Sequence, residues 1–331
     1  MADTRPAILV TGGAGYIGSH AVHALRDAGY PVVVIDDLST GHRALVPDGV
    51  PLIVGDVSDQ PLVRDALHTH GCTGVMHFAG SIIVPESVAD PLKYYGNNTE
   101  ASRRLIESCI ACGVSAFVFS STAVVYGIPE TVPIPETAAT NPISPYGTSK
   151  LMTEWMLRDV AAAADFRYAV LRYFNVAGAD PNGRSGQAGP VTTHLVRTAC
   201  ELITGKRRYI EIFGTDYDTP DGTCIRDYIH VSDLAEAHVL ALEALLSGRQ
   251  DLVVNCGYGH GISVREVLDM AQSLADGPLD IRDAERRPGD APYLIADTQK
   301  IRKTLGWQPR FDDLETIVRS ALAWERARQT K

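Results

Sequence analysis

Short, mostly apolar runs recur along the first half of the chain, and segments with helical spacing follow them. The runs cover residues 7–10, 31–35, 52–54, 74–78 and 116–119. An uninterrupted apolar run of strand length is typical of a parallel strand buried on both faces. The alternation therefore predicts an α/β fold with a doubly wound parallel sheet over residues 1–175.

The first apolar run ends in a glycine-rich turn, TGGAGYIG, directly before a predicted helix. Gly12, Gly15 and Gly18 follow a GxxGxxG spacing. Glycine is needed where a backbone turns tightly, approaches a diphosphate, or lets a helix pack on a strand. The free N–H groups of Tyr16 and Ile17 would open the helix toward the phosphates. The pattern predicts a Rossmann-type dinucleotide site.

The second apolar run ends in a carboxylate, Asp36, 18 residues after Gly18, and Asp37 follows. A carboxylate at this place accepts hydrogen bonds from the ribose hydroxyls and repels a 2′-phosphate. Although Arg43 lies nearby, we expect NAD rather than NADP.

Small and polar residues follow the later strands, where a parallel sheet does its chemistry. After the third run come Asp56 and Val57, which either meet the adenosine or, in the case of Asp56, cap a helix. After the fourth run, Phe78, Ala79 and Gly80 would let the chain pass close to a dinucleotide. A helix is predicted over residues 99–112, and Asn97 or Asn98 either caps it or contacts the cofactor. The fifth run ends in Ser120, Ser121 and Thr122.

Tyr146 and Lys150, in the motif YGTSK, are the main candidates for acid-base chemistry. A proline-containing loop precedes them, and apolar residues at helical spacing follow, so the motif should open a helix with both side chains on one face. A positive charge about 4 Å from the phenol, at an effective dielectric constant of about 20, would lower its pKa by about three units from about 10. We therefore expect Lys150 to make Tyr146 a usable base, although this spacing alone also fits an ordinary solvated helix.

Composition narrows the function classes. The 331 residues are 45% hydrophobic and 21% charged, as in a globular protein, and the net charge of −10 argues against a broad nucleic-acid surface. Six scattered cysteines, with a lone CxxC at Cys109 and Cys112, favour a reduced cytoplasmic protein without a zinc site. His194, His230 and His238 have no spacing that suggests a metal ligand. We expect no signal peptide, membrane segment or metal.

The motifs TGGAGYIG, SSTAVVYG and YGTSK, with Asp36 between the first two, resemble the extended short-chain dehydrogenase/reductase family. The later stretches LRYFNVAGAD, FGTDYDTPDGTCIRDYIHVSD and RRPGD are similar to members that interconvert UDP-glucose and UDP-galactose. The similarity runs from about residue 8 to residue 307, nearly the whole chain. It implies an NAD-dependent 4-epimerase in which Tyr146 takes the O4 proton, NAD takes and returns the C4 hydride, and a 4-keto intermediate rotates in the site.

The resemblance also implies a role for each motif residue. Thr122, Tyr146 and Lys150 would form the catalytic triad, and Lys150 would also hold the nicotinamide ribose. The residues expected to contact NAD are Gly12, Gly15, Tyr16, Ile17, Gly18, Asp36, Asp37, Asp56, Val57, Phe78, Ala79, Gly80, Asn98, Ser120, Tyr146, Lys150 and Tyr173. The residues expected to contact the UDP-sugar are Thr122, Tyr146, Phe174, Asn175, His194, Leu195, Phe213, Arg226, Tyr228, Arg287, Asp290 and Leu294.

The second half of the chain, residues 176–331, should form a smaller α/β domain for the UDP-sugar, while about residues 227–246 return to the NAD domain. Arg226 and Arg287 are cations in irregular, glycine-containing segments that suit a diphosphate, and Phe213 could stack on uracil. Taken singly, each is more often an ordinary surface arginine or packed aromatic residue, but together, in a chain with a dinucleotide-binding half, they favour a second nucleotide. The resemblance further suggests a homodimer.

Three residues depart from the family pattern or bear on specificity. Ile82 stands where some epimerases have a lysine near the cofactor phosphates, and His194 stands where an asparagine is common. Leu294 falls at the gate for an N-acetyl group, so a 4-epimerase of UDP-GlcNAc or of a UDP-pentose is the alternative. Dehydratases of the superfamily place Asp-Glu after the catalytic threonine, whereas this chain has Ala123 and Val124, which cannot transfer protons. A non-catalytic dinucleotide sensor is the least favoured alternative, because the Tyr-Lys pair is present.

Overall fold

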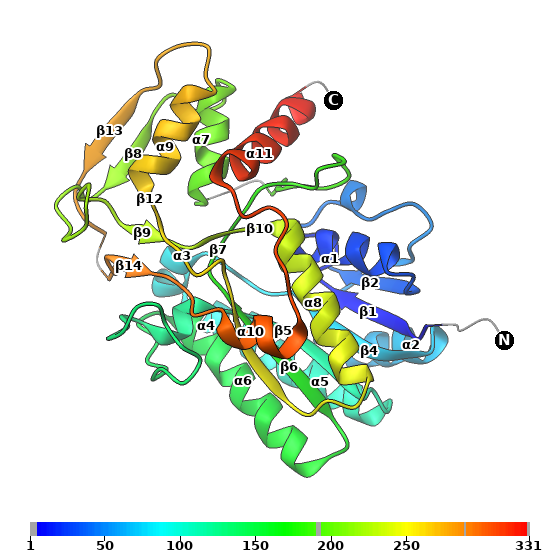
Figure 1. Cartoon of the computed structure of the whole chain (residues 1–331). Helices are drawn as coiled ribbons and strands as arrows, with labels where there is room; N and C mark the ends of the chain where they lie inside the picture. Colours follow the sequence, from blue (N-terminus) through cyan, green and yellow to red (C-terminus); the bar gives the residue numbers. More distant parts are fainter. Residues whose placement is uncertain (1–4, 190–192, 288, 330–331) are drawn as a thin grey trace.

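The computed structural model describes residues 5–189, 193–287 and 289–329, and a seven-stranded parallel sheet forms its centre (Figure 1). The strands lie in the order β11-β6-β5-β4-β1-β2-β3. Their bounds are β1 Ala7–Thr11, β2 Val32–Asp36, β3 Leu52–Val54, β4 Cys72–His77, β5 Ala116–Thr122, β6 Arg167–Tyr173 and β11 Leu252–Cys256. The predicted doubly wound α/β class is confirmed.

Helices cover both faces of this sheet, because successive strand residues point to opposite sides. Ile8 and Val10 pack with α1 and α8 on one face, while Leu9, Val33 and Phe117 pack with α2, α5 and α6 on the other. These helices span α1 Tyr16–Asp27, α2 Gln60–Thr69, α5 Ala101–Ala111, α6 Pro145–Ala163 and α8 Val231–Leu246. The apolar runs of the sequence are therefore the strands of a sheet that is buried on both sides.

A segment from the second half of the chain completes the sheet. Helix α8 packs beside α1, and β11 pairs with β6 in parallel, with Leu252 opposite Ala169. Helix α10 (Gln299–Leu305) packs on both β11 and α8. The returning segment thus reaches beyond residue 246 and includes a strand that the sequence pattern did not predict. The division into two domains at residue 175 stays a prediction.

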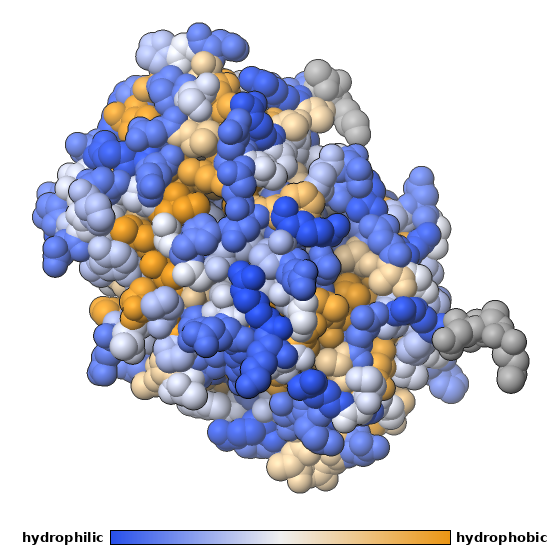
Figure 2. Space-filling model, in the orientation of Figure 1, coloured by the Kyte–Doolittle hydropathy of each residue, from blue (hydrophilic) through white to orange (hydrophobic). Residues whose placement is uncertain are grey.

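The rest of the second half gathers at one end of the sheet, at the top of Figure 1. Its strands are β7 Asn175–Ala177, β8 Ile210–Phe213, β9 Ile225–Arg226, β10 Tyr228–His230, β12 Ile262–Ser263, β13 Ile281–Ala284 and β14 Tyr293–Leu294. Its helices are α7 Leu195–Ile203, α9 Val264–Ser273 and α11 Leu314–Gln329. Hydrophilic side chains dominate the face shown in Figure 2, and apolar groups are exposed in several separate patches between them.

Short helices connect the main elements. They are η1 Arg43–Leu45, α3 Val84–Ala89, α4 Pro91–Tyr94, the π-helical η2 Tyr95–Glu100 and the 3₁₀-helical η3 Ala123–Tyr126. Helix α4, η2 and α5 follow one another without a break, so the helix predicted from residue 99 begins at Pro91. Asn97 and Asn98 lie inside this helical stretch, so the alternative that one of them caps it is wrong, and the contact of Asn98 with the cofactor stays a prediction.

Side chains of α1 connect the sheet to the second half of the chain. The Tyr16 hydroxyl donates to the carbonyl of Gly178 at 2.7 Å, and the Ser19 hydroxyl lies 2.6 Å from that of Ser185. At the far end of the helix, Arg184 contacts Asp27 at 2.9 Å. The helix that follows the glycine turn is therefore joined to the segment after β7 at several points.

Three buried histidines should make the fold sensitive to acid. Burial lowers the pKa of His20 and of His238 to about 4 and that of His77 to about 3. Below pH 6.5, these histidines become protonated in the unfolded chain but stay neutral in the folded chain. The free energy of unfolding therefore falls as the pH drops toward 4. Lowering one pKa by a single pH unit on folding corresponds to about 1.4 kcal/mol, so the three residues together should cost several kcal/mol across this range.

Thermal unfolding at pH 7.5, 6.5, 5.5 and 4.5 measures this effect. The midpoint should change little from pH 7.5 to 6.5 and then fall steeply. His77→Gln, which retains polar atoms near Thr11 and Ser102, should flatten the fall. A midpoint that stays constant down to pH 4.5 would contradict the prediction.

Candidate active site

The YGTSK motif opens helix α6 as predicted. Ser144 caps the helix by accepting a hydrogen bond from the N–H of Gly147 at 3.3 Å, and Pro145 occupies the first helical position. Tyr146 and Lys150 follow one turn apart and are buried, with 7% and 3% of their surfaces exposed. The two side chains therefore share one face of the helix, turned toward the protein rather than toward solvent.

Thr122, the last residue of β5, lies beside them. Its hydroxyl accepts a hydrogen bond from the N–H of Val124 at 3.2 Å and so starts the turn η3. A hydrogen bond from Thr122 also favours the ionised form of Tyr146. The structure thus brings together the three residues predicted as the catalytic triad, at the carboxyl edge of the sheet.

Burial dominates the electrostatics of the triad. It raises the pKa of Tyr146 to about 12, against the opposing effect of Thr122, and it lowers the pKa of Lys150 to about 8, against the charge of Glu154. The ammonium of Lys150 donates to the carbonyl of Ser120 at 3.0 Å and lies 4.9 Å from the Phe119 ring. The expectation that Tyr146 has a pKa below its usual value because of Lys150 is therefore wrong for this structure, because burial of the phenol raises that pKa.

The glycine turn before α1 fits a diphosphate. Gly12 has a φ of +70°, and a Cβ there would lie 2.6 Å from the backbone nitrogen of Ala79. A Cβ on Gly18 would lie 2.1 Å from the carbonyl oxygen of Gly12, so the turn and the helix pack in direct backbone contact. Among the described residues, no side chain caps α1, so the N–H groups of Tyr16 and Ile17 are available to an anion.

Asp36 ends β2 beside this turn and is 6% exposed. Its two carboxylate oxygens accept hydrogen bonds from the N–H groups of Ala14 and Leu38, both at 2.9 Å. Each oxygen keeps a lone pair for a ribose hydroxyl. Asp37 is exposed and bonds Ser39. The carboxylate predicted to select NAD is thus fixed next to the glycine turn.

Asp56 and Val57 follow β3. The carboxylate of Asp56 accepts from the N–H of Ser58 at 2.7 Å, whereas Asp59 is the residue that caps α2. The alternative of Asp56 as a helix cap is therefore wrong. Val57 is buried, and the contact of both residues with adenosine stays a prediction.

Asn98 holds the turn after β4. Its side chain accepts from the N–H of Ser81 at 2.8 Å and donates to the Ser81 carbonyl and to the Ser149 hydroxyl, both at 3.0 Å. Gly80 has a φ of +152°, and a Cβ there would lie 2.8 Å from Asn98. Asn98 therefore fixes the chain that follows Phe78, Ala79 and Gly80 at the end of β4. The sequence had left open whether Asn98 caps a helix or contacts the cofactor.

Two more predicted contacts with NAD, Ser120 and Tyr173, lie at the ends of β5 and β6. Their hydroxyls are hydrogen-bonded to each other. Tyr94, which no sequence motif singled out as a site residue, packs edge-on against Tyr146 at a centroid distance of 6.4 Å. Its hydroxyl donates to the carbonyl of Ile83 at 2.7 Å. Helix α4 thus supports Tyr146, the predicted base, from the side.

The residues predicted for the diphosphate and uracil form two contacting pairs. Arg226 donates to the carbonyl of Ala291 at 2.8 Å and faces the carboxylate of Asp290 at 3.5 Å. The guanidinium carbon of Arg287 lies 3.6 Å from the centre of the Phe213 ring. Pro288, within the RRPGD motif, lies outside the described residues. The structure places Arg287 over the aromatic face that we assigned to uracil.

Leu294 links these pairs to the triad. It lies opposite Arg226 in the β9–β14 pair and packs with Phe174, Val125 and Leu151 in one hydrophobic cluster. Val125 belongs to the turn after Thr122, and Leu151 follows Lys150 on α6. The predicted specificity residue therefore lies between the turn η3, which follows Thr122, and Arg226, which is predicted to bind the diphosphate.

Four other residues predicted to contact the substrate lie on different elements and differ in how far they are buried. Asn175 is exposed at the start of β7, and His194 and Leu195 lie at the start of α7. Burial lowers the pKa of His194 to about 4, so this residue is neutral near pH 7. Tyr228 is 3% exposed and lies within the main hydrophobic core. Contact of these four residues with a substrate stays a prediction.

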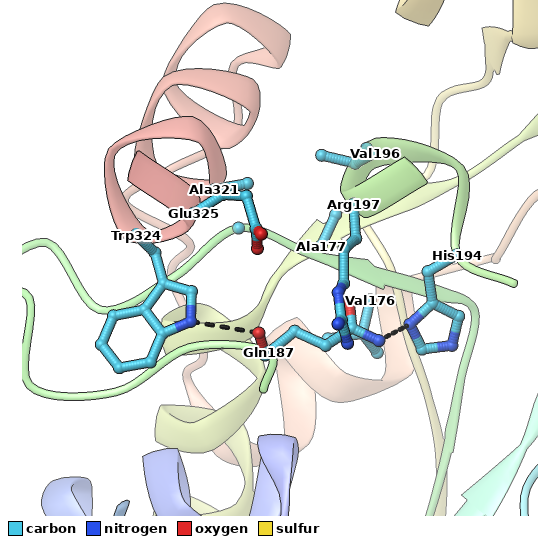
Figure 3. Close-up of a pocket in the computed structure, with 10 residues that line it drawn as sticks. Val176, Ala177, Gln187, His194, Val196, Arg197, Ala321, Trp324 and Glu325 are labelled. Carbon is cyan, nitrogen blue, oxygen red and sulfur yellow. Dashed lines mark hydrogen bonds between the residues drawn. The ribbon is translucent and has the colours of Figure 1, made fainter. Parts of the chain in front are cut away.

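A small cavity lies behind His194 (Figure 3). Gln187 lies between the two sides of this cavity. Its side-chain amide nitrogen lies 2.8 Å from Nδ1 of His194, and its backbone carbonyl accepts a hydrogen bond from the indole N–H of Trp324 on α11 at 3.1 Å. The volume of about 20 Å³ holds about one water molecule, so it is not the site of a sugar nucleotide.

Neither a metal centre nor a membrane span is found within the described part of the chain. No group of three His, Cys, Asp or Glu side chains could hold a metal ion there. None of the helices described is long and apolar enough to span a membrane.

Comparison with known proteins agrees with this geometry. Residues 8–257 match the model of the NAD dependent epimerase/dehydratase family. A UDP-glucose 4-epimerase of Azospirillum brasilense is 59% identical over 97% of this chain and 92% of its own length. A crystal structure of UDP-glucose 4-epimerase from Brucella ovis in complex with NAD has 43% identity and a TM-score of 0.94, over 96% of this chain and 98% of that one. A UDP-Glc/GlcNAc 4-epimerase from Campylobacter jejuni has 44% identity and a TM-score of 0.86, over 98% and 100%. The chain belongs to the NAD-dependent epimerase/dehydratase family.

Proposed function

We propose that the protein interconverts UDP-galactose and UDP-glucose by inverting C4 of the sugar. The observation that carries this proposal is the position of Tyr146, Lys150 and Thr122 between Leu294 and the glycine turn that fits a dinucleotide. Leu294 in turn pairs with Arg226. Curated relatives over nearly the whole chain are UDP-glucose 4-epimerases, which supports the same reaction.

Tyr146 acts as the general base in this proposal. Its phenolate takes the O4 proton, Thr122 hydrogen-bonds the same oxygen, and Lys150 holds the nicotinamide ribose and supplies positive charge. NAD, when bound, accepts the C4 hydride and returns it to the other face, so the reaction has no net redox change. Because Tyr146 has a raised pKa in its buried place, Lys150 and the cofactor must together favour its ionisation.

The residues after Thr122 argue against loss of water from the sugar. Ala123 and Val124 occupy the turn η3, and neither can donate or accept a proton. The keto sugar can therefore only turn about its phosphate linkage and receive the hydride back. Arg226, Arg287 and Phe213 would meanwhile hold the UDP.

Product analysis with UDP-galactose tests the function. The purified protein is first assayed without added NAD and then with it. Conversion to UDP-glucose without additions indicates an epimerase that retains NAD. Activity only with added NAD keeps the function and points to Ile82, which is 57% exposed and uncharged, as a cause of weak retention. No conversion by a folded protein would contradict the proposal and favour another UDP-sugar, or the sensor alternative.

The same assay with UDP-GlcNAc tests the alternative substrate. Leu294 is smaller than tyrosine and larger than cysteine, so Leu294→Cys should increase turnover of UDP-GlcNAc relative to UDP-galactose. Leu294→Tyr should decrease it. If the wild type and both variants have the same ratio of UDP-GlcNAc turnover to UDP-galactose turnover, Leu294 is not the gate.

We also propose a cytoplasmic enzyme of galactose metabolism or of UDP-galactose supply for polysaccharide. All six cysteines are free thiols, which suits a reducing compartment.

A homodimer is supported by apolar side chains on neighbouring helices. Leu92, Met152 and Trp155 are 78%, 37% and 46% exposed, and the sulfur of Met152 lies 3.9 Å from the Thr99 hydroxyl. Leu92 lies on α4, Thr99 lies in the adjoining η2, and Met152 and Trp155 lie on α6, which packs against both. A second copy of the chain would bury this surface.

Light scattering after size exclusion measures the assembly. The wild type should have twice the mass of one chain, and Trp155→Glu should shift it toward one chain. Tyr209→Glu, at an exposed position beside Arg282, is the matched control and should leave the mass unchanged. A wild type with the mass of a single chain would contradict the dimer.

A further inference from the structure

A buried ion pair lies directly behind the triad. Glu154 and Arg172 are 5% and 7% exposed, and the guanidinium contacts both carboxylate oxygens. The Arg172 Nε lies 3.1 and 3.2 Å from the two oxygens, and Nη2 lies 2.5 Å from Oε2. Burying two charges is costly, and a pair of apolar residues would usually stabilise the fold as well. The pair therefore calls for a role beyond stability.

Glu154 is connected to Lys150 in two ways. It follows Lys150 by one turn of α6, so the two side chains share a face. Its Oε1 also accepts a hydrogen bond from the Ser121 hydroxyl at 2.5 Å. Ser121 lies between Ser120, whose carbonyl accepts from Lys150 at 3.0 Å, and the catalytic Thr122. The Glu154 carboxylate thus shares a helix face with Lys150 and is also bonded to Ser121, the neighbour of Thr122 on β5.

Arg172 extends the connection to the turn after Thr122. It stands opposite Ser121 in the β5–β6 pair, and its Nη1 donates to the Tyr126 hydroxyl at 3.0 Å. That hydroxyl donates in turn to Asn255 of β11 at 2.7 Å. Both ends of the segment that carries Thr122 are therefore held by the ion pair and its hydrogen bonds.

We propose that Glu154 and Arg172 are positioning residues for the epimerase reaction, with Glu154 keeping the Lys150 ammonium charged and the pair fixing the segment from Ser120 to Tyr126. The kinetic part of this inference rests on the proposed function. Neither residue contacts the sugar in this scheme, since both act through Lys150, Ser121 and Tyr126.

The groups around Lys150 make Glu154 its source of negative charge. His77 faces it from β4 and is neutral, because burial and Lys150 lower its pKa to about 3. Tyr146 on α6 and Tyr173 on β6 have pKa values raised by burial. Arg172 contributes positive charge from β6. Burial lowers the pKa of Lys150 to about 8, and the Glu154 carboxylate opposes that lowering.

Two variants, each of which removes a charge of opposite sign, test the proposal. Glu154→Gln should lower the pKa of Lys150 by about one pH unit, which moves the alkaline fall of kcat to lower pH and reduces kcat about tenfold above pH 8. Arg172→Gln leaves the carboxylate uncompensated and should move that fall to higher pH. A merely structural defect would reduce kcat in both variants with the same pH profile.

Two readouts separate the inference from the function. The pH profile of kcat is measured with UDP-galactose, and the Lys150 amino group is titrated by ¹⁵N NMR of lysine-labelled protein, with Lys150→Arg to assign the signal. Glu325→Gln is the matched control, because Glu325 is a carboxylate only 2% exposed that pairs with Lys206 far from the triad in sequence. It should leave both profiles unchanged.

Changes of opposite sign in the two variants support the proposal, whereas unchanged profiles or changes of the same sign overturn it. A wild type without epimerase activity refutes the proposed function, while the NMR titration still decides the role of Glu154. If either charge variant does not fold, Tyr126→Phe is used, because it removes one hydroxyl and no charge. It should lower kcat severalfold with an unchanged pH profile and KM, and an unaltered kcat would overturn the proposal.

Discussion

Tyr146→Phe should lower kcat for UDP-galactose by about 10²- to 10⁴-fold, the usual contribution of a general base. The phenyl ring keeps the packing against Tyr94 and within α6, but no atom remains to take the O4 proton. Binding of NAD should persist, because the dinucleotide turn and Lys150 are unchanged. Turnover by product analysis and bound NAD by absorbance of the denatured protein measure the two effects.

Tyr94→Phe is the matched control for this variant. It removes a hydroxyl from the tyrosine that packs 6.4 Å from Tyr146 and that bonds Ile83. It should therefore destabilise the α3–α4 region modestly and leave kcat within about tenfold of the wild type. A Tyr146→Phe protein with more than a tenth of wild-type turnover would show that another group is the base.

Two glycine substitutions in the dinucleotide turn should separate cofactor binding from stability. A Cβ on Gly15 meets only the Gly12 carbonyl oxygen, at 3.1 Å, and Gly15 has a φ of −82°, so Gly15→Ala should fold. The added methyl stands at the start of α1, where the diphosphate must approach the backbone. We expect the Kd for NAD to rise by about tenfold or more, which is about 1.4 kcal/mol.

Gly18→Ala should instead unfold the turn. Its Cβ would lie 2.1 Å from the backbone oxygen of Gly12, which cannot move aside as a flexible side chain can. The cost should lie at or above the upper end of the roughly 1–3 kcal/mol typical of overpacking. Thermal unfolding without cofactor measures this cost.

Gly277→Ala is the control for both glycine variants, because a Cβ there meets nothing within 4 Å. It should change neither the unfolding midpoint nor the Kd for NAD. Equal stability losses in Gly15→Ala and Gly18→Ala would contradict the separation.

The predicted sheet agrees with the structure where strands are short apolar runs between glycine turns and helices. Strand β3 has the predicted bounds of residues 52–54, and β5 extends the predicted run to Thr122. Strands β6 and β11 were both missed, and β11 comes after a long helix of the second half of the chain. The pairing of β11 with β6 depends on α8 crossing back over the sheet. Such a crossover belongs to the tertiary structure and cannot be predicted from the local spacing of apolar residues.

For two polar residues, the sequence left open an alternative that the structure excludes. Asn98 and Asp56 each had a local interpretation as a helix cap, yet the helices begin at Pro91 and after Asp59 instead. A π-helical stretch joins α4 to α5, and no spacing rule predicts that join. Asn98 is thereby free to hold the backbone of Ser81.

The electrostatics of Tyr146 could not be predicted from the Tyr-Lys spacing. The spacing indicates one nearby charge but not burial, which raises the pKa of the phenol to about 12. Glu154 was visible in principle, since it shares a helix face with Lys150. Its partner Arg172 could be recognised only from the register that sets it opposite Ser121.

The contacts of α1 have a consequence for how the cofactor leaves. The helix whose first turn would hold the diphosphate is also joined to the segment from Gly178 to Ser185 through Tyr16 and Ser19. Loosening the first turn thus also strains contacts that the second half of the chain makes with the sheet. If the first turn holds the diphosphate only while this segment is joined to it, thermodynamic linkage requires that whatever stabilises the joined position also strengthens the binding of NAD. The dinucleotide would behave as a resident part of the protein, exchanged on the timescale of local unfolding rather than once per turnover.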